Sequence, residues 1–451
     1  MQVPILGRLN YRDYQALVIG LVLLFLERLL RVVTYCLPSF ILEFFKGQSQ
    51  KIFNMRYKEA RTRPTKIIQC ARSFQEMAKY WGYDVEDHIV KTQDKYMLGI
   101  HRIPKGRYSP KNDEDREKIK SIFNRCGISG SAIRDDIKGI KPVVLLYHGL
   151  MMSSDVWMCN LEEERRLACL LADAGYDVWL GNARGNRYSM KHIKYKPNSR
   201  RFWDYSMDEF ALYDLPDTID HILGITGAPS LTYIGFSQGT AQAFAALSIN
   251  PKLNDKVNLF VALAPATSPK GLQNPIVDAF IKASPNIIYL FFGRKAFITM
   301  TIFWQRVLSP PIYTKILDKF MNFLFGWNGE NMTEDQKAAS YCHLYDFTSV
   351  KSLVHWFQII RANNFQMYDE LPPYSSSTAL GRWCHKFPTE QIKSPVAIFY
   401  GGSDSLVNID VLHKQLPRPA FEKNIPPYEH LGMNSMGSQD EWSLISDIFI
   451  I

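Results

Sequence analysis

The longest apolar stretch of the chain lies close to its N-terminus. Residues 16–26 form an unbroken apolar run, and the apolar pattern continues with a few charged interruptions to Pro38, before a second apolar piece at 40–45. As a helix, the first run would cover about half of a 30 Å hydrocarbon core. We therefore expect residues 1–50 to form a membrane anchor, either a hairpin or in-plane helix pair broken at Pro38 or a single spanning helix. A helix of a soluble domain is the alternative.

Beyond this stretch, short apolar runs alternate with segments of helical periodicity. The apolar runs have the composition of buried parallel strands and lie at 143–147, 176–180, 231–234, 257–263 and 396–400. The helical segments between them lie at 161–174, 207–223 and 238–249. Two β-rich runs at 87–92 and 96–103 predict a hairpin ahead of them. This alternation predicts an α/β fold with a mostly parallel sheet.

The alternation stops between residues 268 and 394, where the chain is rich in aromatic residues and prolines. A stretch of this length is too long for a simple loop and predicts an inserted cap domain. The polar segment 106–140 is expected to be a surface insertion. The predicted organisation is an anchor at 1–50, a first core part at 51–267, a cap at 268–394, and a C-terminal core part at 395–451.

Charge and cysteine content narrow the setting of the protein. The 53 basic and 44 acidic residues give a net charge of +9, and basic residues concentrate between Lys46 and Lys79. Such a cluster suits anionic lipid headgroups or nucleic acid. Because no nucleic-acid-binding motif accompanies it, we expect a membrane partner and no nucleic acid. Basic residues flank the apolar run on both sides, which favours a cytosolic location for both ends. The seven cysteines form no CxxC pair, as is usual in a reducing compartment.

Candidate chemistry begins with the sequence Gly-Phe-Ser-Gln-Gly at 235–239. It follows a predicted strand and opens a predicted helix, which is the context of a nucleophile elbow around Ser237. The alternative is a tight turn whose serine only caps a helix. In hydrolases with such an elbow, the acid and then the histidine follow the serine along the chain.

Two later residues meet that order. Asp404 directly follows the strand predicted at 396–400, and His430 lies in a polar segment further on. Asp404 has helix capping as its alternative role. His413 is the competing histidine, but it lies in a predicted helix close to Asp404, so His430 is preferred. In this hypothesis Ser237 is the nucleophile, His430 the general base and Asp404 the residue that orients it. The backbone N–H groups of Gln238 and Leu150 would form the oxyanion hole.

Several segments together resemble the acid lipase family. They are residues 80–104, 147–150, 173–192, 202–223, 233–240, 401–404 and 426–431. The resemblance implies an α/β-hydrolase fold with a cap, the triad Ser237, Asp404 and His430, and oxyanion positions at Leu150 and Gln238. Residues 4–14 resemble the membrane-anchored yeast steryl ester hydrolases of lipid droplets. Residues 432–435 depart from the family pattern, which commonly has an acidic and then aromatic residues there.

These observations lead to one expected function with alternatives. We expect a membrane-anchored serine ester hydrolase that cleaves steryl esters to sterol and fatty acid through an acyl-enzyme intermediate. A triacylglycerol lipase with the same triad is the alternative, followed by a catalytically silent lipid-droplet scaffold. The expected partners are a neutral lipid substrate and a membrane or lipid-droplet monolayer. The expected location is the lipid droplet or the endoplasmic reticulum membrane, with the catalytic domain facing the cytosol. No cofactor and no metal are implied.

Overall fold

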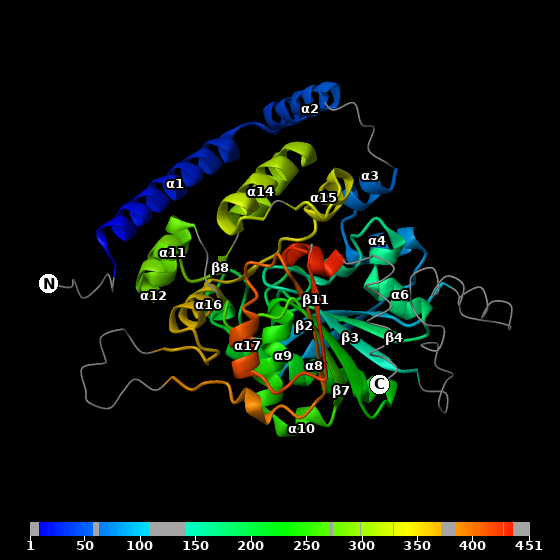
Figure 1. The fold of residues 1–451 in the computed structure, drawn as a ribbon. Coiled ribbons are helices and arrows are strands. Elements are labelled where there is room, and N and C mark those ends of the chain that lie inside the picture. The colour runs from blue at the N-terminus through cyan, green and yellow to red at the C-terminus, as the bar shows by residue number, and fades with distance from the viewer. Residues whose placement is uncertain are drawn as a thin grey trace.

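The computed structural model describes residues 9–56, 63–107, 141–269, 274–297, 299–327, 329–370, 384–426 and 428–435. Nearly all of the predicted insertion at 106–140 lies outside the described residues. Figure 1 shows a central sheet with helices on its faces and a group of helices above one end of the sheet. The two N-terminal helices run along the outer edge of that upper group.

The sheet has nine strands within the described residues, in the order β1-β2-β4-β3-β6-β7-β10-β11, with β5 paired to β2. The strands are β1 (Glu86–Lys91), β2 (Tyr96–Ile103), β3 (Val143–Tyr147), β4 (Asp177–Gly181), β5 (Lys191–His192), β6 (Leu231–Phe236), β7 (Val257–Leu263), β10 (Val396–Gly401) and β11 (Phe421–Ile425). β1 and β2 form the predicted antiparallel hairpin. The neighbouring strands β4, β3, β6, β7, β10 and β11 pair in parallel in that order. The mostly parallel α/β sheet predicted from the sequence is therefore confirmed.

Burial on both faces explains why the central strands are continuous apolar runs. Every residue of β3, β4 and β6 is buried. Each strand covered on both sides contributes a row of apolar side chains to each of two hydrophobic clusters. Parallel pairing also brings the carboxyl ends of β3, β6 and β10 to one edge of the sheet.

The helices that flank the sheet differ in detail from the predicted ones. They are α4 (Phe74–Trp81), α6 (Leu167–Asp173), α7 (Met207–Glu209), α8 (Leu215–Thr226), α9 (Gln238–Ile249), α10 (Pro251–Asn254) and α17 (Ile409–Gln415). The helix predicted at 207–223 is divided by a π-helical segment at Phe210–Asp214. Pro216 then lies in the first turn of α8, directly after the π-helical segment, to which it donates no backbone hydrogen bond because proline lacks an N–H.

The helix predicted at 161–174 starts only at Leu167. The segment ahead of it is held by contacts outside any α-helix. The Leu161 N–H donates to Gln336 Oε1 at 2.8 Å, and Asn160 Nδ2 donates to the Arg165 carbonyl at 2.7 Å. These side chains bond to backbone groups of residues 161–165 in place of helical hydrogen bonds. The helix therefore starts later than the periodic pattern predicts.

The stretch without strand–helix alternation is mainly helical. Its helices are α11 (Pro275–Lys282), α12 (Pro285–Phe292), α13 (Thr299–Val307), α14 (Pro310–Phe325), α15 (Glu334–Ser340) and α16 (Val350–Ala362). Two short strands, β8 (Ala296–Phe297) and β9 (Thr348–Ser349), pair antiparallel. Figure 1 shows these helices above the sheet and below the N-terminal helices. The boundaries 268–394 of this cap stay a prediction.

The N-terminal segment forms α1 (Tyr11–Cys36), α2 (Ser39–Arg56) and α3 (Arg63–Cys70). α1 begins with a capping box between Asn10 and Asp13 and ends just before Pro38. In Figure 1, α1 and α2 follow one another end to end along the molecule rather than folding back as a hairpin. Within the described residues, no helix combines the length and the apolar character that crossing a membrane requires.

Candidate active site

Ser237 occupies a strained turn between β6 and α9. Its backbone has φ 52° and ψ −117°, a conformation that residues with a side chain rarely adopt. The turn is possible only because its neighbours are small. A Cβ on Gly235 would lie 2.7 Å from the Gly239 backbone, and a Cβ on Gly239 would lie 2.6 Å from the Tyr147 carbonyl oxygen. The two glycines therefore let β6 pass directly into α9 with the serine at the bend.

The structure brings the three predicted triad residues together. His430 Nε2 lies 2.7 Å from Ser237 Oγ, and His430 Nδ1 lies 2.7 Å from Asp404 Oδ2. All three are buried, with exposed fractions of 9% for Ser237, 3% for His430 and 9% for Asp404. A carboxylate only accepts hydrogen bonds, so the imidazole proton lies on Nδ1. The Nε2 lone pair is then free to accept the serine proton.

Asp404 combines the two roles that the sequence left open. Its Oδ1 accepts the N–H groups of Leu406 at 2.8 Å and Val407 at 3.3 Å, which fixes the turn after β10. Its Oδ2 holds His430. His413, the competing histidine, lies elsewhere, with its Nε2 2.8 Å from Glu422 Oε2 on the exposed side of α17 and β11. The turn that caps the backbone is thus the same turn that aims the carboxylate at the histidine.

The two predicted oxyanion residues lie on either side of Ser237. Gln238 is the first residue of α9, where backbone N–H groups have no acceptor within the helix. Leu150 follows β3, and the adjacent Gly149 is so close that a Cβ on it would lie 3.2 Å from Ser237 Cβ. The side chain of Gln238 is fixed, because its Oε1 accepts from Trp356 Nε1 at 2.9 Å. Trp356 belongs to α16, and no motif or spacing in the sequence predicts this contact.

His148 supports the oxyanion loop in its neutral form. Its Nε2 accepts the Ala183 N–H at 3.1 Å, and its Nδ1 lies 2.8 Å from the Gly149 carbonyl oxygen. Burial lowers the pKa of His148 to about 4, because water is absent to stabilise the imidazolium. Both ring nitrogens are used in holding the backbone. His148 therefore positions the loop rather than exchanging protons with a substrate.

An ion-pair network joins the cap to the core beside the site. Arg187 Nε lies 2.7 Å from Asp346 Oδ2, and Arg187 Nη1 lies 3.3 Å from Asp155 Oδ2. Asp155 is fully buried, and its pKa is lowered despite burial because His343, Arg187 and Tyr188 all contact or surround the carboxylate. Asp346 lies in the predicted cap, whereas Asp155 and Arg187 lie in the predicted core. The cap is therefore attached to the core by buried charges as well as by apolar packing.

A tryptophan of the cap covers the histidine. The rings of Trp327 and His430 are stacked, with centroids 5.4 Å apart and an angle of 16° between their planes. Trp327 Nε1 donates to Ser405 Oγ at 3.0 Å, next to Asp404. Phe236 contacts His430 from the core, with centroids 5.5 Å apart and a tilt of 37°. The segment that contains Trp327 has neither a strand nor a helical pattern, so no sequence signal pointed to it.

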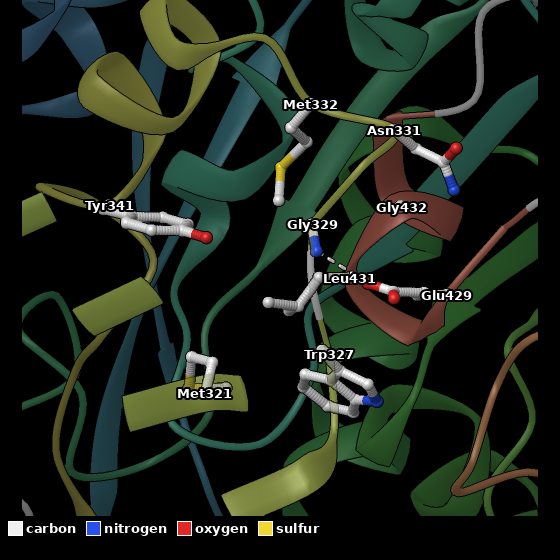
Figure 2. A pocket seen from close by; sticks show the side chains of 9 residues that line it. All are labelled: Met321, Trp327, Gly329, Asn331, Met332, Tyr341, Glu429, Leu431 and Gly432. Carbon is white, nitrogen blue, oxygen red and sulfur yellow. Dashed lines mark hydrogen bonds between the residues drawn. The ribbon is translucent and has the colours of Figure 1, made fainter. Parts of the chain in front are cut away.

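A small cavity lies next to this tryptophan (Figure 2). It is lined by Met321, Trp327, Gly329, Asn331, Met332, Tyr341, Glu429, Leu431 and Gly432. Its volume of about 10 Å³ is about the space that one water molecule needs. It is therefore too small for an acyl chain. The described residues also contain no cluster of three or more His, Cys, Asp or Glu side chains suited to a metal ion.

Comparison with known proteins places the chain in a family. Residues 142–433 match a model described as the alpha/beta hydrolase fold, and residues 74–161 match one described as a partial alpha/beta-hydrolase lipase region. A probable lipase of Schizosaccharomyces pombe is 41% identical over 447 residues, which cover 96% of this chain and 89% of the relative.

Animal lipases are also similar. Gastric triacylglycerol lipase of Rattus norvegicus is 36% identical over 368 residues, covering 79% of this chain and 85% of the relative. Lipase member K of Homo sapiens is 34% identical over 388 residues, covering 83% and 89%. The match to the alpha/beta hydrolase model over residues 142–433 includes Ser237, Asp404 and His430. The chain therefore belongs to the acid lipase family, a family of carboxylic ester hydrolases with the α/β-hydrolase fold.

Proposed function

We propose that the protein is a serine ester hydrolase that cleaves steryl esters to sterol and fatty acid at a lipid surface. One observation carries the catalytic part of this proposal. Ser237, His430 and Asp404 form a chain of two 2.7 Å hydrogen bonds, and the serine stands on a strained turn at the end of β6. A serine hydroxyl is a weak nucleophile unless a base removes its proton, and this arrangement supplies the base.

The proposed reaction has two steps, acylation of Ser237 and hydrolysis of the acyl-enzyme, and the same residues act in both. Ser237 Oγ bonds to the ester carbonyl carbon while His430 Nε2 accepts the hydroxyl proton, and Asp404 stabilises the imidazolium that results. The N–H groups of Gln238 and Leu150 donate to the oxyanion. Collapse of the intermediate breaks the bond to the sterol oxygen, which takes the proton from His430. A water molecule, deprotonated by the same imidazole, then releases the fatty acid and restores Ser237.

The proposed place of action is a lipid monolayer or membrane. The reason is that α1 turns a face containing several polar residues towards the protein and most of its large apolar side chains outward. Its least exposed positions follow a seam with helical spacing, and several of them are polar or small: Asp13, Gly20, Glu27, Arg31 and Thr34. Most of its large apolar side chains point away from the protein, although Ala16 and Leu17 are buried against it. Val18, Phe25 and Val32 are 60%, 65% and 55% exposed. A helix of a water-soluble protein turns its apolar stripe inward, whereas lipid reverses that preference.

Polar contacts fix this orientation of α1 on the cap. Glu27 Oε1 accepts from Trp304 Nε1 at 2.9 Å, and Asp13 Oδ1 lies 3.5 Å from Lys282 Nζ. Gly20 allows close approach, since a Cβ there would lie 3.1 Å from Ile276 Cγ2. An in-plane arrangement of α1 and α2, with the catalytic domain on the cytosolic side of a lipid droplet or the endoplasmic reticulum, is the form of anchor that we propose.

Two substrates suit this chemistry. Two arguments favour steryl esters as the substrate. Residues 4–14 resemble steryl ester hydrolases, and steryl esters are stored in the apolar lipid to which α1 is proposed to bind. Triacylglycerol is the second candidate, because gastric triacylglycerol lipase is among the relatives. The triad would act on either ester in the same way, so the shape of the acyl and alcohol pocket decides between them.

The test compares hydrolysis of cholesteryl oleate and trioleoylglycerol in mixed micelles by the detergent-solubilised full chain. The variants are Ser237→Ala and, as a matched control, Ser248→Ala, which removes another buried hydroxyl from the same helix. Cleavage of cholesteryl oleate that is lost in Ser237→Ala and kept in Ser248→Ala supports the proposal. Preference for trioleoylglycerol transfers the function to the second candidate. No cleavage of either ester by folded wild-type protein favours a silent scaffold.

A further inference from the structure

The histidine of the site is held by the cap as well as by the core. Three contacts join the cap segment 325–329 to the residues around His430. Trp327 stacks on the imidazole, Trp327 Nε1 donates to Ser405 Oγ at 3.0 Å, and the Gly329 N–H donates to Glu429 Oε2 at 2.9 Å. Figure 2 shows Gly329 facing Glu429 and Trp327 below them in the same region. The residues on both sides of the Asp404–His430 bond thus depend on one short cap segment.

Stacking on Trp327 restricts the tilt of the His430 ring, which the hydrogen bonds to Asp404 and Ser237 restrict less. The bonds to Asp404 and Ser237 lie roughly in the plane of the imidazole ring, so they fix its direction better than its tilt. The core offers only the tilted contact with Phe236, whereas Trp327 lies nearly parallel to the ring at 16°. A flat aromatic face also attracts the imidazolium that forms when the serine proton is transferred.

Trp327 is itself rigidly placed. It is 6% exposed, and its ring stacks on Phe325 with centroids 4.4 Å apart and an angle of 15°. Between these two residues, Gly326 has φ 73°, which ends α14 in a left-handed turn and directs the chain towards the site. The ring is thus fixed by a stack, a hydrogen bond and a helix end, as expected of a side chain that locates another.

We propose that Trp327 is a positioning residue for His430, which couples the seating of the cap to the rate of catalysis. This inference rests on the proposed function, because it requires His430 to act as the base. The coupling extends outward along α14. Ile316, Phe320 and Phe323 of that helix are 53%, 49% and 55% exposed, and Trp327 follows its C-terminal end. A displacement of α14 therefore moves the ring that lies against the histidine.

The experiment measures hydrolysis of p-nitrophenyl butyrate, a short ester, by the detergent-solubilised full chain. Trp327→Leu removes the stack and the hydrogen bond, and Trp327→Phe keeps an aromatic face. We expect Trp327→Leu to lower kcat by about 10- to 100-fold with KM within about threefold of wild type, since small misplacements of a catalytic group cost up to about 10²-fold. Trp327→Phe is expected to restore kcat to within about threefold of wild type.

Two further variants separate positioning from folding. Trp81→Leu is the matched control, because Trp81 is half-buried and donates to the Met158 carbonyl at 3.1 Å. It is expected to keep the wild-type kcat. Ser405→Ala removes the acceptor of the Trp327 bond and the bond that Ser405 Oγ donates to the Phe325 carbonyl at 3.3 Å, but it leaves the stack on His430 in place. We expect it to lower kcat by about threefold with KM unchanged. It tests the proposal even if Trp327→Leu does not fold, which the thermal unfolding midpoint of each variant reveals.

Three results overturn the inference. They are a Trp327→Leu enzyme with kcat within threefold of wild type, a variant that is faster than wild type, and a loss seen in KM that phenylalanine does not rescue. A faster variant would mean that Trp327 obstructs the site. A KM effect that phenylalanine does not rescue would mean that Trp327 contacts the substrate. Failure of the proposed function has a different signature. In that case Ser237→Ala hydrolyses the ester as well as the wild type does, whatever the Trp327 variants do.

Discussion

Two apolar helices of this protein have opposite environments. In α9, all eleven residues from Gln238 to Ser248 are buried, and most of them are apolar or small. In α1, a helix of 26 residues, only Asp13, Ala16, Leu17, Gly20 and Thr34 are buried. α9 lies against the sheet and begins at the serine of the active site. α1 places the polar residues Asp13 and Thr34, together with Ala16, Leu17 and Gly20, against the cap, and most of its large apolar side chains outward. Apolar composition alone therefore does not tell whether a helix belongs in a core; the position of the few polar residues does.

The largest effect is expected at the candidate site that lies at the start of α9, where Asp404 holds His430 beside Ser237. Asp404→Asn keeps the size of the side chain but removes the charge that holds the His430 Nδ1 proton, so we expect kcat on p-nitrophenyl butyrate to fall by about 10⁴-fold. The unfolding free energy should change little by comparison. A steady-state assay with the purified full chain measures the loss. Retention of more than a tenth of wild-type kcat would show that the carboxylate has no part in the reaction.

The middle of α9 is expected to tolerate no charge. Ala243 is 1% exposed, so Ala243→Glu places an unpaired carboxylate in the core. We expect the unfolding free energy to fall by about 3–5 kcal/mol, measured from urea unfolding monitored by circular dichroism. A loss below about 1 kcal/mol would mean that the helix has access to water there and that its contrast with α1 is mistaken.

The buried histidines predict a dependence of stability on pH. Burial lowers the pKa of both His148 and His355 to about 4. The unfolded chain therefore binds more protons than the native one below the ordinary histidine pKa of about 6.5, and stability rises with pH in that range. The stabilisation is complete above pH 6.5 and is lost as the pH falls towards 4.

We expect each histidine to cost on the order of 2 kcal/mol at pH 5 relative to pH 7. His355 Nε2 lies 2.8 Å from the Gln366 carbonyl oxygen, a bond that a glutamine side chain can replace. His355→Gln should therefore reduce the difference in unfolding free energy between pH 7 and pH 5, measured by urea titration at both values. An unchanged difference would exclude His355 as a source of the pH dependence.

The outer face of α1 should accept the charge that α9 rejects. Phe25 is 65% exposed. Phe25→Glu is expected to change the unfolding free energy by less than about 0.5 kcal/mol. The same substitution should weaken binding to cholesteryl oleate droplets coated with phospholipid, measured by flotation, because it places a charge in the proposed contact. Destabilisation by more than 2 kcal/mol would instead indicate that this face packs against protein.

The most local effect is expected where α1 meets α11. A Cβ on Gly20 would meet Phe280 Cε2 at 3.3 Å as well as Ile276. Gly20→Ala should loosen the contact between α1 and α11 by about 1 kcal/mol. Faster hydrogen exchange confined to these two helices is the measurement, and Gly47→Ala is the control, since a Cβ there would meet nothing within 4 Å. Equal protection in both variants would contradict the close contact.

The sequence predicted the sheet and the positions of the candidate site because both rest on local signals. Apolar runs mark strands that are buried on both faces, and strand ends are where Ser237 and Asp404 stand. His430 is preferred over His413 because His413 lies in a predicted helix close to Asp404, and the structure places His430 beside the serine. The catalytic roles of these residues stay predictions until they are measured.

Other features depend on contacts between distant parts of the chain. Trp327 reaches His430 across about a hundred residues, and Trp356 reaches Gln238 across 118. Nothing in the aromatic-rich stretch around either tryptophan marks one ring as more important than another. The direction of α1 was equally hidden, because its seam becomes visible only when α11 is known. Tertiary contacts, rather than propensity, decide such features.

The seam of α1 has a consequence for the order of events during synthesis. Its partner residues come far later in the chain, with 269 positions between Asp13 and Lys282. α1 ends at Cys36 and α11 begins at Pro275, 239 positions later, so at about 5–20 residues per second α1 is complete roughly 12–48 s before α11 begins to be made. Throughout that interval its apolar side chains have no protein surface to meet, so a nearby lipid surface competes with water and chaperones alone. The contacts that hold α1 on the cap therefore form only after more than half of the chain has been synthesised.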